Sequence, residues 1–465
     1  MKNSPADAAP IIVWFRRDLR LADNPALFAA VRTGRPVIPL YILDETPGVR
    51  PPGAAGLWWL DKSLARLGEA LADKGGQLIL RRGEAAEIVG KLAADCAAAG
   101  VYWNRLYAPD ADARDDALAA DLQRNGVEVQ RFNASLLAEP GAVRTKAGGP
   151  FSVFTPYWRT ARTQVEIGEI HRAPARLTPP ARHPQSDDLA AWKLHPRKPD
   201  WSKGFDIWTP GEEGAKAQLG LFLDDALAHY PIGRDLPAIE GSSRLSPYLH
   251  WGEIGPQQVW RSLDGALERD EATDATVEKF RAELGWREFN HHILATHPDL
   301  ATKSFKPAYD HFPWRKDAAG LAAWRAGRTG YPLVDAGMRQ LWATGWMHNR
   351  VRMVVGSFLI KHLLIDWREG ERWFWDTLVD ADEANNPANW QWVAGSGADA
   401  QPFFRIFNPT SQAERYDAKQ AYIRRWVPEL ARGGVGYPKP IVDHAEARAR
   451  ALAALKALPQ QEGAA

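Results

Sequence analysis

The hydrophobic pattern changes once along the chain, and this change constrains the fold more than any other feature. From residue 11 to about residue 135, short apolar runs alternate with Ala-, Leu- and charge-rich stretches of helical spacing. Strands that alternate with helices indicate parallel βαβ units and a doubly wound sheet. The predicted strands span residues 11–15, 37–43, 77–80, 101–107 and 127–132, and the predicted helices between them span 56–74, 84–99 and 111–124.

The second part of the chain has a different pattern. Residues 171–210 are rich in proline and poor in apolar runs, which indicates a long irregular connector. Beyond residue 212 the strand pattern does not return, and helical spacing appears at 214–229, 257–268, 275–297, 333–344, 349–364 and 368–380. We therefore predict an α/β domain at 10–140, a connector at 141–210, an all-helical domain at 211–432 and a loosely structured tail at 433–465.

Composition narrows the function classes. The 465 residues carry 58 basic and 57 acidic side chains, and 45% are hydrophobic, as in ordinary soluble globular proteins. The longest uncharged apolar run, 353–360, is far shorter than the roughly 20 residues of a membrane span. The single cysteine, Cys96, excludes an intrachain disulfide and a cysteine-rich metal site. We therefore expect a cytoplasmic protein without a membrane segment.

Basic residues cluster locally although the net charge is only +1. Between Asp335 and Asp366 the sequence has no acidic residue, and it has four cations there: Arg339, Arg350, Arg352 and Lys361. Such a patch could neutralise several phosphates of a nucleic acid. The alternative is a helical segment whose arginines pair with acids elsewhere in the fold, and the sequence leaves both possibilities open.

Two further segments combine polar groups with aromatic or small residues. In YPIGRDLPAIEGSSRLSPY, residues 230–248, glycine and serine precede a predicted helix, an arrangement that can hold phosphate oxygens or simply cap the helix. In LGWREFNHH, residues 284–292, the preceding Glu283 shares a helix face with Trp286 and Arg287. This face could hydrogen-bond and stack a base, or it could be an ion pair beside a packed indole.

Two later segments place neutral amides close to charged groups. In GWMHNRVRM, residues 345–353, Asn349 and Met353 are one helical turn apart, beside Arg352, and could line a cavity around a planar polar ligand. In LVDADEANNPANWQW, residues 378–392, two carboxylates precede Asn385-Asn386-Pro387, which predicts a loop. A D-x-D pair can bind a metal, but neither a His cluster nor a further acidic pattern accompanies it, so we expect no metal site.

Together these segments resemble the photolyase/cryptochrome family, and the overall pattern is most similar to bacterial class III photolyases that act on cyclobutane pyrimidine dimers. The motifs occur in the family's order over nearly the whole chain, from about residue 11 to residue 430: WFRRDLRLADNPAL at 14–27, SSRLSPYL at 242–249, TGYPLVDAGMRQL at 329–341, GWMHNRVRM at 345–353, IDWREGE at 365–371 and FRIFNPTSQ at 404–412. The resemblance implies an α/β domain joined by a long connector to a helical FAD-binding domain.

The resemblance also implies a cofactor, FAD, active in its reduced anionic form. Residues at the matching cofactor positions are Tyr230, Ser242, Ser243, Arg244, Leu245, Ser246, Asn349, Arg352, Asp380, Asp382 and Asn386. In the family Arg352 and Asp380 would pair, and Asn386 would face flavin N5, where plant cryptochromes typically carry Asp. Trp390, Trp367 and Trp314 match the family's electron-transfer chain from flavin to surface.

The implied substrate is UV-damaged DNA. Glu283, Asn349 and Asn386 match catalytic positions, and residues at substrate- and DNA-contacting positions are Arg234, Glu283, Trp286, Arg287, Asn349, Arg350, Met353, Trp392 and Gln412. The (6-4) photolyases have histidines where this chain has Asn349 and Met353, so cyclobutane pyrimidine dimers are favoured. The alternatives are a (6-4) photolyase and a cryptochrome-type blue-light receptor.

The resemblance implies an antenna chromophore in or near the α/β domain. Asp44 and Glu45, at the end of the second predicted strand, could accept hydrogen bonds from a pterin, or they could be two exposed acids in a loop. We expect methenyltetrahydrofolate, with a deazaflavin or the absence of an antenna as alternatives. We further expect a monomer that needs no obligate protein partner and associates with the nucleoid during repair.

Overall fold

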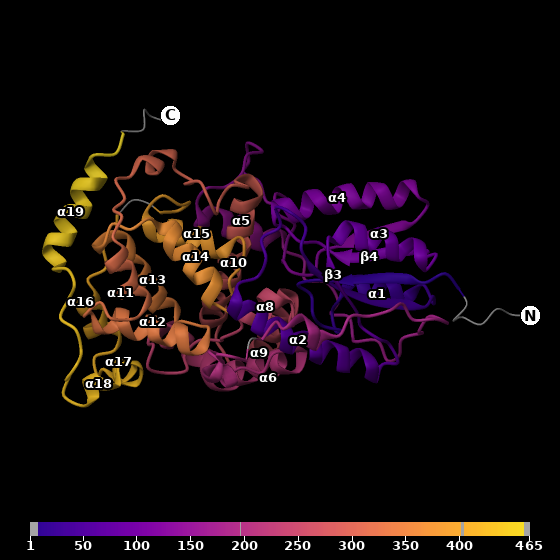
Figure 1. Ribbon diagram of the computed structural model, residues 1–465, viewed down its shortest axis with the longest axis horizontal. Coiled ribbons are helices and arrows are strands. Elements are labelled where there is room, and N and C mark those ends of the chain that lie inside the picture. Colours follow the sequence, from indigo (N-terminus) through magenta and orange to yellow (C-terminus); the bar gives the residue numbers. More distant parts are fainter. Residues whose placement is uncertain (1–7, 196, 401–403, 460–465) are drawn as a thin grey trace, which may run out of the picture.

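Five parallel strands form the sheet of the first part of the chain in the computed structural model, which describes residues 8–195, 197–400 and 404–459 (Figure 1). Their order is β3-β2-β1-β4-β5. The central strand β1 pairs in register with its neighbours, so that Ile11 lies opposite Val37 on one side and Gly100 on the other. The strands span Ile11–Phe15 (β1), Val37–Asp44 (β2), Ile79–Gly83 (β3), Gly100–Asn104 (β4) and Glu128–Phe132 (β5).

Helices cover both faces of this sheet, which confirms the predicted doubly wound fold. Alternate residues of β1 divide between the two apolar cores: Ile12 and Trp14 pack with the helices α3 and α4, whereas Val13 and Phe15 pack with α1 and α2. The helices span Pro25–Arg32 (α1), Ala54–Asp73 (α2), Ala85–Asp95 (α3) and Pro109–Arg124 (α4). The sequence reading missed α1, a short helix that Asn24 caps through the Leu27 N–H.

The edge strand β3 begins two residues later than predicted. It pairs with Leu40–Asp44 of β2 and therefore extends through Arg81 and Arg82. The prediction ended before these residues because it followed the run of apolar side chains. Charged side chains are tolerated there because an edge strand is only half covered.

The connector region contains regular structure as well as irregular chain. Helix α5 (Phe154–Gln164) packs against the long helix α10 (Asp274–Thr296). The contact is close, because a Cβ atom on Gly285 of α10 would lie 2.5 Å from the Trp158 ring. Two short 3₁₀ turns follow, Leu189–Trp192 (η2) and Lys203–Ile207 (η3).

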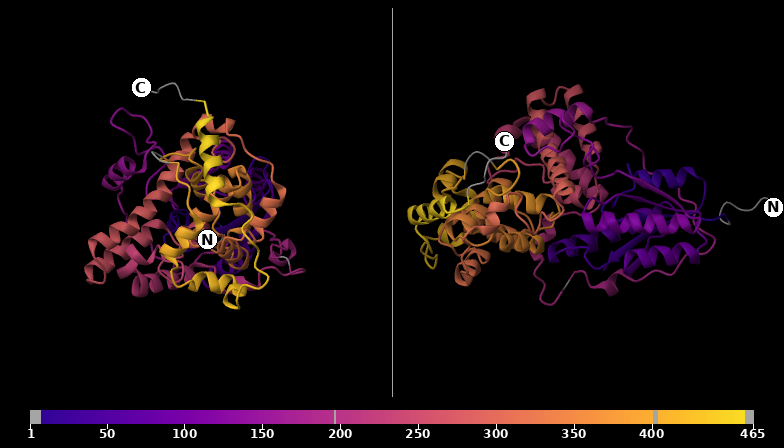
Figure 2. Two further views of the ribbon diagram at one scale, coloured as in Figure 1. Left: turned by 90° about the vertical axis from the view of Figure 1, so that its left-hand side faces the viewer. Right: turned by 90° about the horizontal axis from the view of Figure 1, so that it is seen from above.

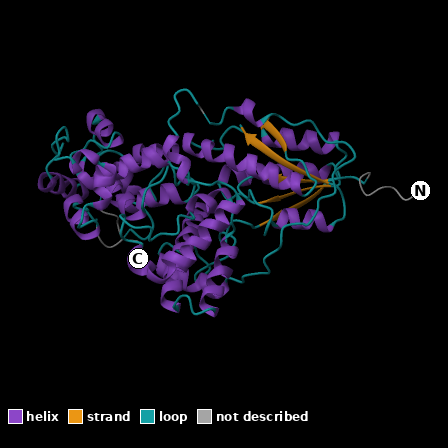
Figure 3. Ribbon diagram, turned by 90° about the horizontal axis from the view of Figure 1, so that it is seen from below, coloured by secondary structure: helices purple, strands orange, loops and turns teal. Residues whose placement is uncertain are grey.

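The second part of the described chain is helical, and Figures 2 and 3 show it packed against the sheet part, with which it shares an apolar core. Two π-helical turns, Phe222–Ala226 (η4) and Phe358–His362 (η7), interrupt its helices. The other elements are Glu212–Leu221 (α6), Leu227–His229 (η5), Tyr230–Gly233 (α7), Ser246–Trp251 (α8), Pro256–Glu268 (α9), Asp274–Thr296 (α10), Pro307–His311 (η6), Ala318–Arg325 (α11), Pro332–Thr344 (α12), Asn349–Ser357 (α13), Trp367–Thr377 (α14), Asn385–Ala394 (α15), Pro409–Tyr416 (α16), Ala421–Trp426 (α17), Pro428–Ala431 (α18) and His444–Lys456 (α19).

Two local predictions in this part were wrong. Asn385-Asn386-Pro387 begins helix α15 instead of forming a loop, because a proline in the first turn of a helix loses no intrahelical hydrogen bond. The tail contains helix α19, whose buried Ala447, Ala451 and Ala454 lie on one face against η7. The last six residues of the predicted tail lie outside the described part of the chain.

Ion pairs and close backbone contacts join the sheet to the helical part. Arg17, just after β1, pairs with Glu383 at 2.7 Å, and Arg50 pairs with Glu371 of α14 at 2.7 Å. At Gly53, next to Arg50, a Cβ atom would lie 2.1 Å from the Trp375 carbonyl oxygen. These contacts fix one edge of the helical part against the sheet. Among the described residues, we find no helix long and apolar enough to cross a bilayer.

Candidate functional site

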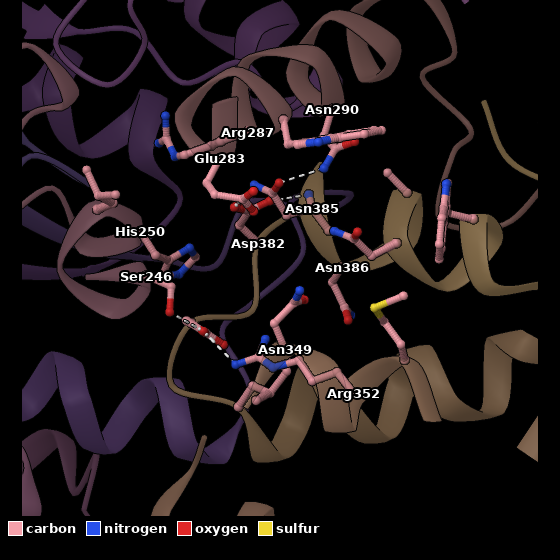
Figure 4. Close-up of a pocket in the computed structure, with 18 of the residues that line it drawn as sticks. Ser246, His250, Glu283, Arg287, Asn290, Asn349, Arg352, Asp382, Asn385 and Asn386 are labelled. Atoms are coloured by element: carbon pink, nitrogen blue, oxygen red, sulfur yellow. Dashed lines mark hydrogen bonds and ion pairs between the residues drawn. The ribbon is translucent and has the colours of Figure 1, made fainter. Parts of the chain in front are cut away.

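A cavity of about 530 Å³ lies inside the helical part, between α8, α10, α13 and α15 (Figure 4). Its size is within the usual range for small-molecule and cofactor sites. The predicted residues that line it come from five separate sequence segments: Tyr230, Arg234, Ser242, Ser243, Arg244, Leu245, Ser246, Glu283, Trp286, Arg287, Asn349, Arg352, Met353, Asp380, Asp382, Asn386, Trp390 and Trp392. The structure thus brings together most of the residues singled out from the sequence.

The glycine-serine segment forms one wall of the cavity. Gly241 packs directly on the backbone of Gly233, since a Cβ atom there would lie 2.4 Å from the Gly233 carbonyl carbon. Arg244 adopts a left-handed conformation with φ of 52°. The Ser246 hydroxyl donates to Asp380 Oδ2 at 2.6 Å. This wall therefore offers hydroxyls and a guanidinium to a ligand.

The D-x-D carboxylates have structural partners. Arg352 donates to Asp380 Oδ2 at 2.8 Å, so the predicted Arg352–Asp380 contact is present, and Asp380 Oδ1 is buried without a hydrogen-bond partner among the described residues. Asp382 accepts from the backbone N–H groups of Ala384 and Asn385. Over the described ranges, no cluster of three or more His, Cys, Asp and Glu side chains is arranged to hold a metal ion.

Two neutral amides point into the cavity from facing helices. Asn349 begins α13 and Asn386 lies in the first turn of α15 (Figure 4). Asn386 Nδ2 donates to the Glu371 carbonyl oxygen at 3.0 Å and to Glu371 Oε1 at 2.8 Å. This contact fixes the amide and leaves Oδ1 of Asn386 as the acceptor that remains for a ligand.

Aromatic and acidic groups line the α10 side. Trp286 stacks on Phe154 with ring centroids 3.8 Å apart. Glu283 pairs with Arg234, while Arg287 donates to the Ser135 carbonyl oxygen at 2.5 Å. The alternative of an ion pair between Glu283 and Arg287 is therefore wrong, and Arg287 ties α10 to the sheet part.

The basic cluster predicted between Asp335 and Asp366 is largely neutralised. Arg339 pairs with Glu429 at 2.7 Å, Arg350 pairs with Asp235 at 2.8 Å, and Arg352 pairs with Asp380. Lys361 is buried, donates to the Arg405 carbonyl oxygen, and has a pKa lowered by burial to about 7. The alternative reading, arginines paired with acids elsewhere in the fold, is the one that the structure supports.

The three predicted electron-transfer tryptophans lie in one apolar cluster. Trp390 lines the cavity and is 4% exposed, Trp367 is fully buried, and Trp314 is half-buried at the edge of the cluster. Trp390 also packs edge-to-face against Phe374 at 4.9 Å. Oxidisable rings therefore extend from the cavity wall toward the surface.

Besides Trp367 and Trp314, four predicted site residues do not line the cavity. Arg350 and Gln412 lie on α13 and α16, outside the lining set. Asp44 and Glu45 lie in the sheet part, where Arg114 pairs with Asp44 and Arg82 pairs with Glu45 at 2.8 Å. Asp44 ends β2 and is partly buried, whereas Glu45 follows the strand and is exposed, so the alternative of exposed acids in a loop holds for Glu45 alone.

Sequence reasoning missed several lining residues. Trp346 donates to the Ser246 hydroxyl at 3.4 Å, and Asn290 donates to Asn385 Oδ1 at 2.7 Å. His250 is buried one helical turn after Ser246, and burial together with Arg17 holds its pKa well below 6.5, so its imidazole is neutral. Burial likewise lowers the pKa of His348 to about 4. The motifs are the signal that could have identified two of these residues, because His250 directly follows SSRLSPYL and Trp346 lies within GWMHNRVRM.

Two family models match the chain. A model described as "DNA photolyase" matches residues 11–181, which include the sheet. A model described as "FAD binding domain of DNA photolyase" matches residues 280–434, which include most of α10 and all of α13, α14 and α15.

Known proteins match over nearly the full length. A deoxyribodipyrimidine photo-lyase of Agrobacterium fabrum is 50% identical, with 97% of this chain and 98% of the relative covered. The crystal structure of a bacterial class III photolyase from Agrobacterium tumefaciens, also 50% identical, superimposes with a TM-score of 0.94 over 98% of this chain and 99% of that one. Cryptochrome-1 of Arabidopsis thaliana is 37% identical over 97% of this chain and 71% of its own length.

Proposed function

Because the chain belongs to the photolyase/cryptochrome family, we propose that it is a deoxyribodipyrimidine photo-lyase that uses light to repair cyclobutane pyrimidine dimers in UV-damaged DNA. One observation carries the proposal: Glu283, Trp286, Asn349, Met353 and Trp392 line the same cavity as the residues proposed to hold FAD. A cofactor and a flipped-out lesion would therefore share one enclosed space.

The lining residues fit FAD. The hydroxyls of Ser242, Ser243 and Ser246 and the guanidinium of Arg244 would hold the pyrophosphate. Asp380 Oδ1 is a buried acceptor without a partner among the described residues, as expected of a group that binds a ligand N–H. Arg352 holds Asp380 in place, and Asn386 presents a carbonyl oxygen toward the proposed flavin position. Reduced anionic FAD, when bound, supplies the electron on photoexcitation.

The α10 side of the cavity would receive the lesion. Base flipping would carry the dimer out of the duplex and into the cavity, where Trp286 and Trp392 give apolar contact surfaces. Glu283, whose carboxylate pairs with Arg234, would accept hydrogen bonds from the N3–H groups of the pyrimidines and so orient the dimer. One electron enters the dimer, the two bonds joining the pyrimidines break, and the electron is returned, so no net redox change results.

The tryptophans would return an oxidised cofactor to the active state. Trp390, Trp367 and Trp314 would be oxidised in turn, which moves the electron vacancy from the cavity wall to the half-buried Trp314, where an external reductant can fill it. Trp314 is the most exposed of the three residues, which supports this direction.

The amide and thioether at positions 349 and 353 favour cyclobutane dimers over (6-4) photoproducts. Acid–base chemistry on a (6-4) lesion needs titratable groups, and Asn349 and Met353 have none. The buried His348 lines the same cavity, and Nδ1 of this N-cap residue accepts a hydrogen bond from the Arg350 backbone N–H at 3.2 Å.

The proposed antenna is methenyltetrahydrofolate bound near Asp44 and Glu45, where it would share these acids with Arg114 and Arg82. We propose that the enzyme acts as a monomer without an obligate protein partner.

Single-lesion duplexes test the substrate. The prereduced protein would be illuminated with two duplexes of the same sequence, one carrying a thymine cyclobutane dimer and one a (6-4) photoproduct, and the restored thymines would be counted by chromatography. We expect light-dependent repair of the first duplex alone. Repair of the (6-4) duplex would contradict the assignment of Asn349 and Met353, and repair of neither duplex would favour a photoreceptor.

A further inference from the structure

Two adjacent residues near the cavity, Arg234 and Asp235, carry opposite charges, and each forms an ion pair with a different helix. Arg234 pairs with Glu283 of α10, and the next residue, Asp235, pairs with Arg350 of α13 at 2.8 Å. The segment after α7 thus connects α10 and α13. Arg234 and Arg350, which match DNA-contacting positions of the family, are both held by carboxylates of the same chain.

Arg350 is held from two sides. Its Nη2 donates to Asp235 Oδ1, and its guanidinium lies 4.5 Å from the centroid of the Tyr416 ring of α16. The ring would continue to orient the guanidinium after the Asp235 contact opens. Asp235 is therefore not required to keep Arg350 in position.

The exposure of Asp235 favours release of its carboxylate from Arg350. Its side chain is 36% exposed, against 18% for Arg350, so the released carboxylate would be hydrated at once. It does not line the cavity, whereas Glu283 does. Among the described residues, Arg350 is the ion-pair partner of Asp235. A carboxylate and a phosphate offer similar oxygens to a guanidinium, so only one of them can occupy this donor at a time.

We propose that Asp235 competes with DNA phosphate for Arg350, so that its carboxylate weakens DNA binding and must be released when Arg350 contacts the backbone. This inference rests on the function proposed above. It gives a specific role to a residue that touches neither the cofactor cavity nor the lesion: Asp235 sets how tightly the enzyme holds DNA.

Binding in the dark tests the competition. The FAD-loaded full chain would be titrated with a duplex carrying one thymine dimer between about 50 and 200 mM NaCl. We expect Asp235→Asn to bind about two- to fivefold more tightly at low salt, as for a partly exposed ion pair. We also expect the slope of log K against log salt to steepen by up to about 0.9, as for one added phosphate contact. Arg350→Gln should bind more weakly with a shallower slope.

The double variant Asp235→Asn/Arg350→Gln separates competition from a general charge effect. If Asp235 acts through Arg350, the double variant binds like Arg350→Gln alone. Asp73→Asn, at an exposed position of α2 in the sheet part, makes the same charge change as a matched control and should bind like the wild type. The flavin absorbance of each variant confirms that it folds and holds its cofactor.

Three results would overturn the inference: Asp235→Asn binding no more tightly than Asp73→Asn, Asp235→Asn binding more weakly than the wild type, or a gain that persists in the double variant. A wild-type protein that does not prefer the lesion duplex to the same duplex without a lesion would instead refute the proposed function. The two failures are therefore distinguishable.

Discussion

The close packing of the Trp390 ring against Gly370 predicts how Gly370→Ala changes stability and photoreduction. The ring lies between Gly370 of α14 and Gly356 of α13. A Cβ atom on Gly370 would lie 2.1, 2.4 and 2.6 Å from three carbons of the ring, whereas a Cβ atom on Gly356 would lie 3.5 Å from it. Gly370→Ala therefore requires the ring to move by about 1 Å, and Gly356→Ala does not.

The ring has little room to move. Trp390 is 4% exposed and packs against Phe374 at 4.9 Å and Trp324 at 6.2 Å. Overpacking of a filled core costs about 1–3 kcal/mol. Alanine is preferred to glycine within helices by about 1 kcal/mol, which offsets part of this cost. We therefore expect Gly370→Ala to lower the free energy of unfolding by up to about 2 kcal/mol.

Urea unfolding of the FAD-loaded protein measures the effect. Gly90→Ala, in α3 with open space at the Cβ position, is the matched control and should stabilise by about 0.5–1 kcal/mol. Because Trp390 moves, photoreduction of oxidised flavin should also slow in Gly370→Ala. If Gly370→Ala were as stable as Gly90→Ala and photoreduced at the wild-type rate, the tight slot around Trp390 would be refuted.

Three further predictions concern the electron chain, the buried acids and the contact between the two parts of the chain. Trp367→Phe should block photoreduction of oxidised flavin, followed by flavin absorbance, yet leave repair by prereduced enzyme nearly unchanged; loss of repair by the reduced enzyme would make the assignment of Trp367 wrong. Burial raises the pKa of Glu253 from 4.5 to about 8, although Ser63, Trp59 and the Gly211 N–H donate to it, so the native state holds a proton that the unfolded chain has released. Stability should therefore fall as the pH rises from about 4.5 to 8. Glu253→Gln, which fixes the neutral form, should remove the contribution of Glu253 to this slope and leave that of Glu288, whose pKa burial raises to about 7; parallel profiles of unfolding midpoint against pH would contradict this. Arg50→Gln leaves the buried Glu371 without its cation and should destabilise by about 1–3 kcal/mol in urea unfolding, whereas Arg66→Gln, in an exposed pair with Glu69, should change stability by less than about 0.5 kcal/mol; equal effects would show that the Arg50–Glu371 contact is unimportant.

The sheet could be predicted from the sequence because its inner strands are buried on both faces. Residues 11–15 are apolar throughout, and β1 spans these same residues. The predicted bounds of the edge strand β3 were wrong because pairing with β2 sets where β3 begins and ends. The sequence of β3 alone does not show this pairing. Helix α15 was read as a loop because Asn-Asn-Pro is common in loops, although the same residues also begin helices.

The sequence motifs identified most residues of the candidate site. They did not predict the contacts between segments that are distant in the sequence. The partner of Arg350 is Asp235, 115 residues away, and the partner of Asn386 is Glu371 on a neighbouring helix. A count of charges left open whether the basic cluster is free or paired, and the fold pairs its three arginines with acids from distant parts of the chain. Likewise, nothing in IDWREGE indicates that Gly370 must be glycine until the Trp390 ring is seen against it.

Repair under light compared with darkness tests the central claim most directly. Prereduced protein would be mixed with UV-irradiated oligothymidine, and thymine absorbance would be followed under blue light and in parallel in the dark. The account predicts recovery of absorbance in the light and none in the dark. No recovery in the light from protein that holds reduced FAD would contradict it.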